Sequence, residues 1–319
     1  MHSARTARDS YYSGRMKDSA AATLLGIDWG TSNRRAWWLG AAGTVLAEHA
    51  DDQGLLAVKG GFAQSLAMLR QMGPALTAHA PIVMSGMVGS ASGWLETPYA
   101  DASMPLAQLT RHLVPVPAGG PQCFIVPGLC RSSADGGMDV MRGEETQLLG
   151  ALTLGHGDGW YVLPGTHSKW VRLHDGRVCD LATYMTGELY ALLSQHGTLA
   201  SLGGPHTEGE DAPAAFEHGV AAAGRSALSN ALFGCRAQVV AGRMPARHAS
   251  EYLSGVLIGA EWHDVARRAG GAPKRATLIG SPQLARRYAS VAALFGCHID
   301  HLDARTAQLA ALGVLRAAL

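Results

Sequence analysis

A short apolar run that ends in an acid, a glycine and two hydroxyl residues offers the clearest chemistry in this sequence. Residues 24–29 read Leu-Leu-Gly-Ile-Asp-Trp, and Gly30, Thr31 and Ser32 follow. The pattern predicts a buried strand and a turn at which Asp28 could hold a hydrated Mg²⁺ ion. Gly30 would let the backbone come close to a phosphate, and the N–H and hydroxyl groups of Thr31 and Ser32 could donate to its oxygens.

A second turn of the same kind follows another apolar run. Residues 160–164 read Trp-Tyr-Val-Leu-Pro, and Gly165, Thr166, His167 and Ser168 come next. Because Gly-Thr-x-Ser again ends a predicted strand, we expect Gly165, Thr166 and Ser168 to bind phosphate as well. Two such turns could grip one triphosphate from opposite sides.

A third apolar strand, residues 276–279, leads into Gly280 and Ser281. Ser281 as the N-cap and Pro282 at the first helical position predict a helix that runs to about residue 294. Glycine at this junction leaves room for a flat ring or a phosphate beside the helix N-terminus. Gly280 and Ser281 are therefore candidate nucleotide contacts.

The elements around the first two turns follow the same order in both halves of the chain. Each half is predicted to run strand, turn, strand, turn, strand, helix, and the second helix covers 187–195 with Thr186 as its N-cap. This order predicts an α/β protein with two similar domains that face each other across a cleft. The glycine-rich stretch 155–159 suits a boundary, so we expect an N-terminal domain over 21–154 and a C-terminal domain over 155–319.

The composition points to a protein that binds a small ligand. Of the 319 residues, 47% are hydrophobic and 16% charged, and 26 Lys and Arg against 25 Asp and Glu give a formal net charge of +1. This balance gives no excess of positive charge that would favour binding to nucleic acid or to an anionic membrane surface. No apolar run is long enough to span a membrane. Five scattered cysteines fit reduced thiols, so we expect a cytoplasmic protein. Residues 1–20 lack periodicity and are predicted to be a disordered extension.

Polar clusters outside the three turns are predicted to be structural. His298 and Asp300 would share one face of a strand and His301 would lie on the other, so the three cannot converge on a metal ion. Residues 261–264 lie in a predicted helix, and we expect them on the surface. The last helix is predicted to pack closely through the small residues around Gly313.

The three turns, taken in order, resemble the phosphate 1, phosphate 2 and adenosine segments of the actin, sugar-kinase and Hsp70 superfamily. The resemblance implies two actin-like (ribonuclease H-like) ATPase domains around a central cleft. Longer blocks are similar to the 2-dehydro-3-deoxygalactonokinase family, and the likeness covers about residues 23–318. These blocks are residues 85–99, 141–147, 164–170 and 184–190.

The family resemblance implies phosphorylation of the C6 hydroxyl of 2-dehydro-3-deoxy-D-galactonate in galactonate breakdown, with ATP and Mg²⁺ as cofactors. Three alternatives stay open. One is a kinase for a related keto-deoxy sugar acid such as 2-dehydro-3-deoxy-D-gluconate. The others are a phosphohydrolase of the exopolyphosphatase type and a nucleotide-dependent assembly or sensor protein. The partner is expected to be a small sugar acid rather than nucleic acid or membrane, and the chain could form a homodimer.

Phosphoryl transfer to a hydroxyl needs a carboxylate that orients the acceptor and takes its proton. Glu144 and Glu145 are the candidates, because they follow Gly143 where a helix is predicted to begin and because Arg142 adjoins them. The pair resembles the Gly-x-Glu-Glu segment that carries the catalytic glutamate in exopolyphosphatases, and we slightly favour Glu145. The alternative is that two acids merely suit the helix dipole.

A keto-acid substrate carries a carboxylate, which a guanidinium group binds better than an ammonium group does. Arg142 and Arg34 are therefore candidates, although Arg34 could instead bond its strand neighbours. Lys169 could neutralise the substrate carboxylate or the γ-phosphate, or it could lie on a solvent face.

The loop over residues 85–99 could surround a polyhydroxy chain. Ser85 and Gly86 would supply backbone and hydroxyl groups, with Tyr99 nearby and Trp94 packed on the C–H face of the substrate. The alternative is a Gly/Ser connection that the two aromatic residues anchor to the core.

Overall fold

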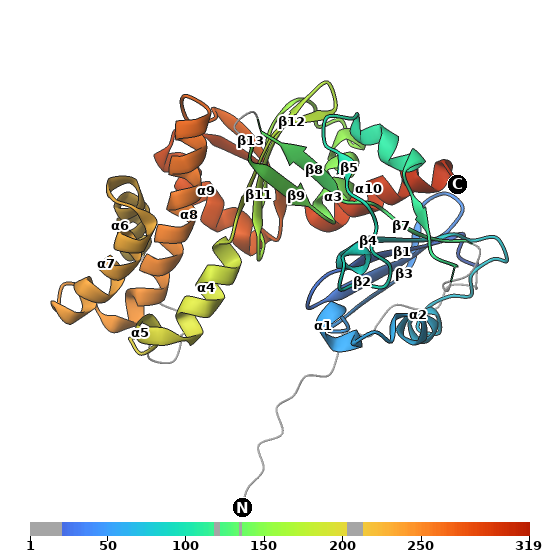
Figure 1. The fold of residues 1–319 in the computed structure, drawn as a ribbon, viewed down its shortest axis with the longest axis horizontal. Coiled ribbons are helices and arrows are strands. Elements are labelled where there is room, and N and C mark those ends of the chain that lie inside the picture. Colours follow the sequence, from blue (N-terminus) through green and yellow to red (C-terminus); the bar gives the residue numbers. More distant parts are fainter. Residues whose placement is uncertain (1–20, 118–121, 134–135, 203–212) are drawn as a thin grey trace, which may run out of the picture.

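The structure is a computed structural model that describes residues 21–117, 122–133, 136–202 and 213–319. Over these residues the chain forms two α/β units, each built on its own sheet, with a group of helices beside the second sheet (Figure 1). The predicted extension at residues 1–20 lies outside the described residues.

The first sheet has the strand order β3-β2-β1-β4-β7-β6. Strands β1, β2 and β3 are antiparallel neighbours, whereas β4 pairs in parallel with β1 and β7. Helix α2 (Phe62–Arg70) packs its apolar side on this sheet. The short helix α1 (Leu55–Val58) lies between β3 and α2 in the sequence. The strands are β1 (Leu24–Trp29), β2 (Arg34–Leu39), β3 (Val45–Asp51), β4 (Ile82–Gly86), β6 (Val114–Pro115) and β7 (Cys123–Ile125).

The second sheet repeats the pattern of the first in the order β12-β11-β10-β13-β14. An antiparallel meander of three strands is again joined to parallel strands at its first member, β10. The repetition of strand order predicted for the two halves is therefore confirmed. The strands are β10 (Gly159–Leu163), β11 (Ser168–His174), β12 (Arg177–Tyr184), β13 (Arg275–Gly280) and β14 (His298–Asp303).

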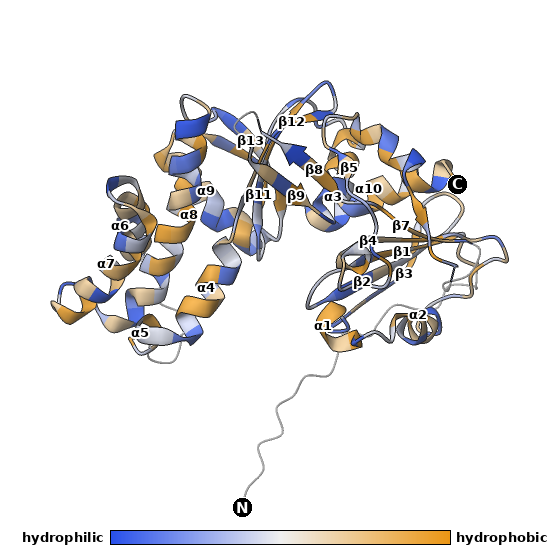
Figure 2. Cartoon of the chain, viewed as in Figure 1, coloured by the Kyte–Doolittle hydropathy of each residue, from blue (hydrophilic) through white to orange (hydrophobic). Residues whose placement is uncertain are grey.

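Between β12 and β13 the chain forms a group of helices beside the second sheet (Figure 1). Apolar and polar residues both occur along these helices (Figure 2). The predicted N-cap is wrong, because Met185 is the N-cap of α4 and Thr186 already belongs to the helix. The helices are α4 (Thr186–Gln195), α5 (Gly197–Ala200), α6 (Pro213–Arg225), α7 (Leu228–Val240), α8 (Ala249–Arg268) and, after β13, α9 (Pro282–Leu294).

A small third sheet of β5 (Ala100–Asp101), β8 (Leu129–Ser132) and β9 (Met138–Met141) joins the two units. Asp139 of β9 accepts hydrogen bonds from the backbone N–H and the hydroxyl of Thr183 in β12, at 2.7 and 2.6 Å. Short 3₁₀ turns complete this region at Met87–Gly89 and Leu106–Arg111. These contacts connect the loop region of the first unit to the second sheet.

Two helices cross between the main sheets, α3 (Glu144–Thr153) and α10 (Ala304–Ala317) (Figure 1). Leu148 of α3 and Leu312 of α10 belong to one buried cluster that also contains apolar residues of both sheets. The closest approach is at Gly150, where a Cβ atom would lie 1.7 Å from the carbonyl oxygen of Ala307. Close packing through small residues of this helix is found at Ala307 and Ala311, which are fully buried, but not at Gly313 itself, where a Cβ atom would meet nothing within 4 Å.

Candidate active site

The first predicted turn lies where β1 ends, and its shape is fixed by backbone hydrogen bonds. The N–H of Gly30 donates to the carbonyl of Asn33 at 2.9 Å, and the carbonyls of Gly30 and Thr31 accept from the first residues of α1. Thr31 and Ser32 are exposed. Their side chains and N–H groups are therefore available to an anion, as the predicted phosphate role requires.

Asp28 lies next to charged groups from two other elements. Its direct cross-strand neighbours are Arg35 of β2 and Ser85 of β4. Removal from water raises the pKa of the Asp28 carboxyl to about 6, and this rise is opposed by Arg35 and reinforced by the negative charge of Glu144. Asp28, near the end of β1, and Glu144, at the start of α3, are thus close enough for their charges to interact, and we call them the acid pair.

Glu144 connects the first unit to the second. Its side chain is 24% exposed, and one oxygen lies 3.4 Å from Nζ of Lys169, the second residue of β11. The other oxygen accepts from the N–H of Arg142 at 3.1 Å. Lys169 is only 6% exposed, so the solvent-face alternative for it is wrong. The turn after β1, the start of α3 and the start of β11 therefore converge on one place.

Glu145 points into the core instead. It is fully buried, and its two oxygens accept from the N–H of Gly143 at 2.6 Å and from the hydroxyl of Thr146 at 2.9 Å. Burial and the neighbouring Glu144 charge raise the pKa of Glu145 from 4.5 to about 8, so the group is mostly protonated at neutral pH. Its burial and its bonds to Gly143 and Thr146 speak against the slight preference for Glu145 as base, and Glu144 is the more accessible of the two.

The raised pKa of Glu145 predicts how the free energy of unfolding depends on pH. Its folded-state pKa is raised, so the native state binds the proton more tightly than the unfolded chain, and stability is lost as pH rises from 4.5 towards about 8. Glu145→Gln stays neutral throughout and should avoid this loss. We expect the free energy of unfolding of the wild type to fall by a few kcal/mol relative to the variant across this range, at about 1.4 kcal/mol per pKa unit. Urea unfolding of both proteins at several pH values checks this, and parallel curves would contradict it.

Arg34 does not fit the predicted substrate role. It is 2% exposed, its Nε and NH2 atoms bind both carboxylate oxygens of Asp51 at 3.2 and 2.6 Å, and NH1 donates to the hydroxyl of Ser65 at 2.7 Å. The guanidinium also lies over the ring of Trp29. The two N–H groups that would bind a substrate carboxylate thus bind Asp51 within the first unit. The alternative that Arg34 bonds its strand neighbours is the one that the structure supports.

Arg35 is the residue that sequence reasoning missed at this turn. Residues opposite each other in antiparallel strands share a face, so Arg35 lies on the Asp28 side and Arg34 on the other. Arg35 is exposed, and its charge acts on the Asp28 carboxyl. Strand alternation relative to Asp28 was the signal that could have found it.

The loop over residues 85–99 is largely structural in this state. Ser85 is buried, donating to the carbonyl of Ile27 at 3.5 Å and accepting from Gln308 at 3.0 Å, so its predicted substrate contact is not supported. Trp94 stacks on Phe62, with ring centroids 6.2 Å apart, which favours the anchoring alternative.

Gly86 and Gly143 allow two segments of the site to approach. Gly86 has a φ of 91°, and a Cβ atom on it would lie 2.8 Å from the carbonyl oxygen of Trp29. A Cβ atom on Gly143 would lie 3.3 Å from Cα of Gly86. Glycine is required at Gly86 for backbone reasons, so its role is to bring the start of α3 against the end of β4.

Arg142 and Tyr99 form a stacked pair at the edge of the loop. The guanidinium carbon of Arg142 lies 4.3 Å from the centre of the Tyr99 ring, and its NH1 and NH2 atoms donate to the hydroxyl and carbonyl of Thr97 at 2.5 and 2.9 Å. The Nε atom of Arg142 is buried and has no hydrogen-bond partner among the described residues. Tyr99 is exposed. Arg142 is thus oriented by two neighbours and keeps one donor unused.

The second predicted turn projects from the second sheet. Gly165, Thr166 and His167 are exposed, and a Cβ atom on Gly187 would lie 2.4 Å from the carbonyl oxygen of Gly165. The N–H of Glu188 donates to the carbonyl of Thr166 at 3.0 Å. The N-terminus of α4 therefore supports this turn directly.

Ser168 faces away from the turn, so its predicted phosphate contact is wrong. Its hydroxyl is buried and donates to a carboxylate oxygen of Glu261 at 3.0 Å. Glu261 and Trp262 are also buried, at 1% and 0% exposure, which corrects the expectation that residues 261–264 lie on the surface. Strand alternation puts Ser168 on the core face and Lys169 on the Glu144 face.

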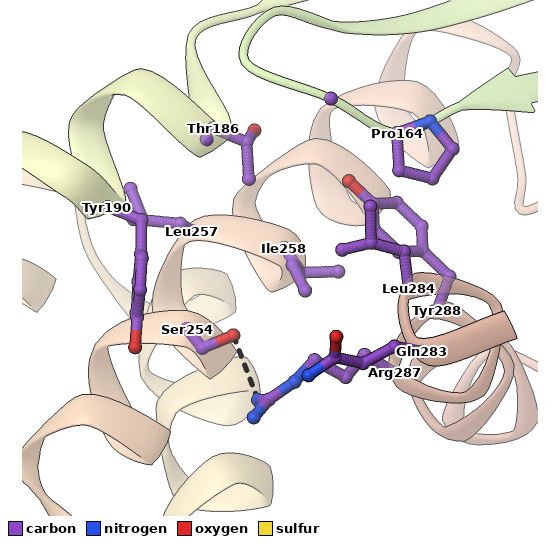
Figure 3. Close-up of a pocket in the computed structure, with 12 residues that line it drawn as sticks. Pro164, Thr186, Tyr190, Ser254, Leu257, Ile258, Gln283, Leu284, Arg287 and Tyr288 are labelled. Carbon is purple, nitrogen blue, oxygen red and sulfur yellow. Dashed lines mark hydrogen bonds between the residues drawn. The ribbon is translucent and has the colours of Figure 1, made fainter. Parts of the chain in front are cut away.

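A cavity of about 260 Å³ opens beside the second turn (Figure 3). Most of its surface is apolar, with polar groups from α4, α8 and α9, as is common in small-molecule sites. Ser281 caps α9 by accepting from the N–H of Leu284, and Gly280 ends β13, where an added Cβ atom would lie 3.5 Å from Pro164, but neither of these two predicted nucleotide contacts lines the cavity. The lining residues are Pro164, Gly165, Thr186, Gly187, Tyr190, Ser254, Leu257, Ile258, Gln283, Leu284, Arg287 and Tyr288.

Sequence reasoning missed most of this lining, because α8 contributes to it from a distant part of the chain. Two signals were present: Thr186 to Tyr190 belong to a block singled out by resemblance, and Gln283 and Leu284 begin the helix predicted after Ser281. Ser254, Leu257 and Ile258 lie in the middle of a helix and carry no local signal.

The remaining polar clusters lie elsewhere. Nε2 of His298 lies 3.3 Å from Oδ1 of Asp300. His301, on the other side of the strand, forms a hydrogen bond between its Nε2 atom and the carbonyl oxygen of Gly280. In the part of the chain that the structure describes, the grouping closest to a metal-ligand set is the exposed trio Asp158, His174 and Asp175. No helix among the described residues is long and apolar enough to cross a membrane.

Two similar α/β units, each with a Gly-Thr turn after its first strand, form an actin-like, ribonuclease H-like fold, and by its family the chain is a phosphotransferase. The sequence model of the 2-keto-3-deoxy-galactonokinase family matches residues 28–315, and the chain belongs to this family.

Relatives of known name agree with this assignment. A 2-dehydro-3-deoxygalactonokinase of Escherichia coli (strain K12) is 36% identical over 90% of this chain and 94% of its own length. DgoK1 of Rhizobium meliloti (strain 1021), named for the same activity, is 35% identical over 92% and 96%. The crystal structure of a Sinorhizobium meliloti protein, also named as a 2-dehydro-3-deoxygalactonokinase, superposes with a TM-score of 0.82 at 34% identity, covering 92% of this chain and 95% of that one.

Proposed function

We propose that the chain transfers the γ-phosphoryl group of ATP to the C6 hydroxyl of 2-dehydro-3-deoxy-D-galactonate in galactonate catabolism. The observation that carries the proposal is the convergence of Asp28, Glu144 and Lys169 between two exposed Gly-Thr turns. Membership of the family supports the identity of the substrate. A cytoplasmic location, where ATP and sugar acids are both present, belongs to the same proposal.

ATP would lie across both units. The cavity beside the second turn would take the adenosine, because its walls are apolar and one of its edges is the N-terminus of α9. The β- and γ-phosphates would lie between Gly30, Thr31 and Ser32 on one side and Gly165 and Thr166 on the other. Exposed N–H groups and helix N-termini both favour bound phosphate. The proposed boundary near residue 154 separates these two halves of the site.

The acid pair fits a magnesium ion. Asp28 and Glu144 offer carboxylate oxygens, which Mg²⁺ prefers, and the negative charge of Glu144 raises the pKa of Asp28, an effect that a bound cation would offset. Asp28 would hold the ion through water. A bound Mg²⁺ would neutralise charge on the phosphates during transfer.

Glu144 is the group best placed to act on the acceptor. It lies at the first position of α3, it is partly exposed, and one of its oxygens lies 3.4 Å from Nζ of Lys169. There it would accept a hydrogen bond from the acceptor hydroxyl, orient its oxygen and take its proton. Arg35, beside Asp28, and Lys169 would stabilise the negative charge on the transferring group.

The substrate carboxylate is proposed to meet Arg142. Its stacking on Tyr99 and its bonds to Thr97 fix the plane of the guanidinium, and the residue is only partly buried. Closure of the two units around α3 and α10 would bring Arg142 and the second turn onto a substrate and exclude water.

The test is a coupled assay of ADP release over a set of keto-deoxy sugar acids. We expect ATP-dependent turnover with 2-dehydro-3-deoxy-D-galactonate, weaker turnover with the gluconate-derived isomer, and little ADP release without an acceptor. Mass spectrometry of the product should show one added phosphate at C6. Phosphate release that needs no acceptor would instead indicate the phosphohydrolase, and a higher kcat/KM for the gluconate isomer would reassign the substrate.

A further inference from the structure

One buried carboxylate, that of Glu261, accepts hydrogen bonds from several elements around the cavity beside the second turn, which we call the nucleotide cavity. Glu261 of α8 is 1% exposed and lies behind the cavity rather than in its lining. One of its oxygens accepts from the hydroxyl of Ser168 at 3.0 Å and from the indole N–H of Trp170 at 2.9 Å. The other accepts from the hydroxyl of Tyr288 at 2.8 Å and from the hydroxyl of Thr186.

The four donors come from three elements that are separate in the sequence. Ser168 and Trp170 begin β11 directly after the second turn, Thr186 begins α4, and Tyr288 lies on α9. Thr186 and Tyr288 also line the cavity, where Figure 3 shows them on different sides of Ile258. Glu261 is therefore bonded at the same time to the turn, to the helix that supports the turn, and to the wall of the cavity.

We propose that Glu261 is a positioning residue for ATP, which fixes the second phosphate turn against the N-terminus of α4 and the adenosine wall on α9. The inference rests on the proposed nucleotide site but not on the identity of the sugar acid. A buried carboxylate is costly unless its oxygens are fully paired; here two bonds come from residues that line the cavity and two from the strand that follows the second turn.

The chemistry of the donors explains why an acid is needed. An indole N–H can only donate, so the oxygen facing Trp170 must be an acceptor. Glutamine could keep that oxygen and turn its amide towards the hydroxyls of Thr186 and Tyr288, which can also accept. Methionine, of similar length, would leave the Trp170 and Thr186 donors without this acceptor, whereas the hydroxyls of Ser168 and Tyr288, 3.1 Å apart, could still bond each other.

The experiment measures Mg·ATP binding by calorimetry without a sugar acid, and then KM for ATP and for the sugar acid. Thr186→Val and Tyr288→Phe each remove one bond to the carboxylate and should weaken ATP binding about fivefold to tenfold, since bonds to charged groups are stronger than neutral ones. KM for the sugar acid should stay within about twofold. Glu261→Gln should weaken ATP binding less than Glu261→Met.

Asp264→Asn is the matched control, because Asp264 lies one turn further along α8 and bonds Tyr184 and Arg267 outside this network. It should bind ATP as the wild type does. A lower melting temperature with unchanged ATP affinity in Thr186→Val and Tyr288→Phe would overturn the proposal, as would equal rises in both KM values. If the wild type binds ATP but phosphorylates no keto-deoxy sugar acid, the proposed substrate fails while the binding data still decide the role of Glu261.

Discussion

Glu144→Gln should lose turnover by about 100-fold to 10,000-fold, the usual effect of removing a group that accepts a proton in the transition state. The amide has nearly the same shape but cannot take the proton of the acceptor hydroxyl. It also gives up the ion pair with Lys169, 3.4 Å away, which then faces the site without its counter-charge. The loss should appear in kcat at saturating ATP and sugar acid, while circular dichroism and the melting temperature show a folded protein.

Glu145→Gln is the matched control for this prediction. Glu145 is already protonated near neutral pH and bonded to Gly143 and Thr146, so a neutral amide replaces it with little change at the reacting atoms. We expect kcat close to the wild-type value. A severe loss in Glu145→Gln with near-normal turnover in Glu144→Gln would return the role of base to Glu145.

The turns were predictable because they depend on local sequence. An apolar run followed by glycine and hydroxyl residues needs no distant partner to form a strand and a tight bend, and both turns lie where predicted. The start of α9 was predictable for the same reason, since Ser281 and Pro282 act within one helical turn.

The direction of each side chain was harder to predict, because it depends on tertiary packing. Neighbours in sequence have opposite roles at three places, Arg34 and Arg35, Glu144 and Glu145, and Ser168 and Lys169. In the strands, alternation settles the question once one residue has a known face. At the start of α3 it does not, because which glutamate is buried depends on how the helix lies against the rest of the core.

Glu261 shows the limit most clearly. A lone glutamate in a helix is nearly always exposed, so the surface was the reasonable expectation. Its partners lie 93, 91, 75 and 27 residues away in the sequence. Only the assembled fold brings those donors around one carboxylate.

The crossing of α3 and α10 leads to the second large effect. An added methyl group at Gly150 would lie 1.7 Å from the Ala307 carbonyl oxygen, and because that atom is backbone it cannot turn aside as a side chain would. Gly150→Ala must therefore separate the two helices. We expect a loss of about 2–3 kcal/mol in the free energy of unfolding, despite a gain of about 1 kcal/mol in helix propensity.

Gly313→Ala in α10 is the control, because its methyl group would meet nothing within 4 Å and should leave stability equal or slightly higher. Denaturant unfolding of both variants measures the difference. Turnover should fall in Gly150→Ala as well, since α3 carries Glu144 at its first position and a shift of the helix moves that carboxylate away from Lys169. Equal stability in the two variants would show that α3 and α10 tolerate a wider spacing. The contact at Gly150 would then not fix the position of the two units relative to each other.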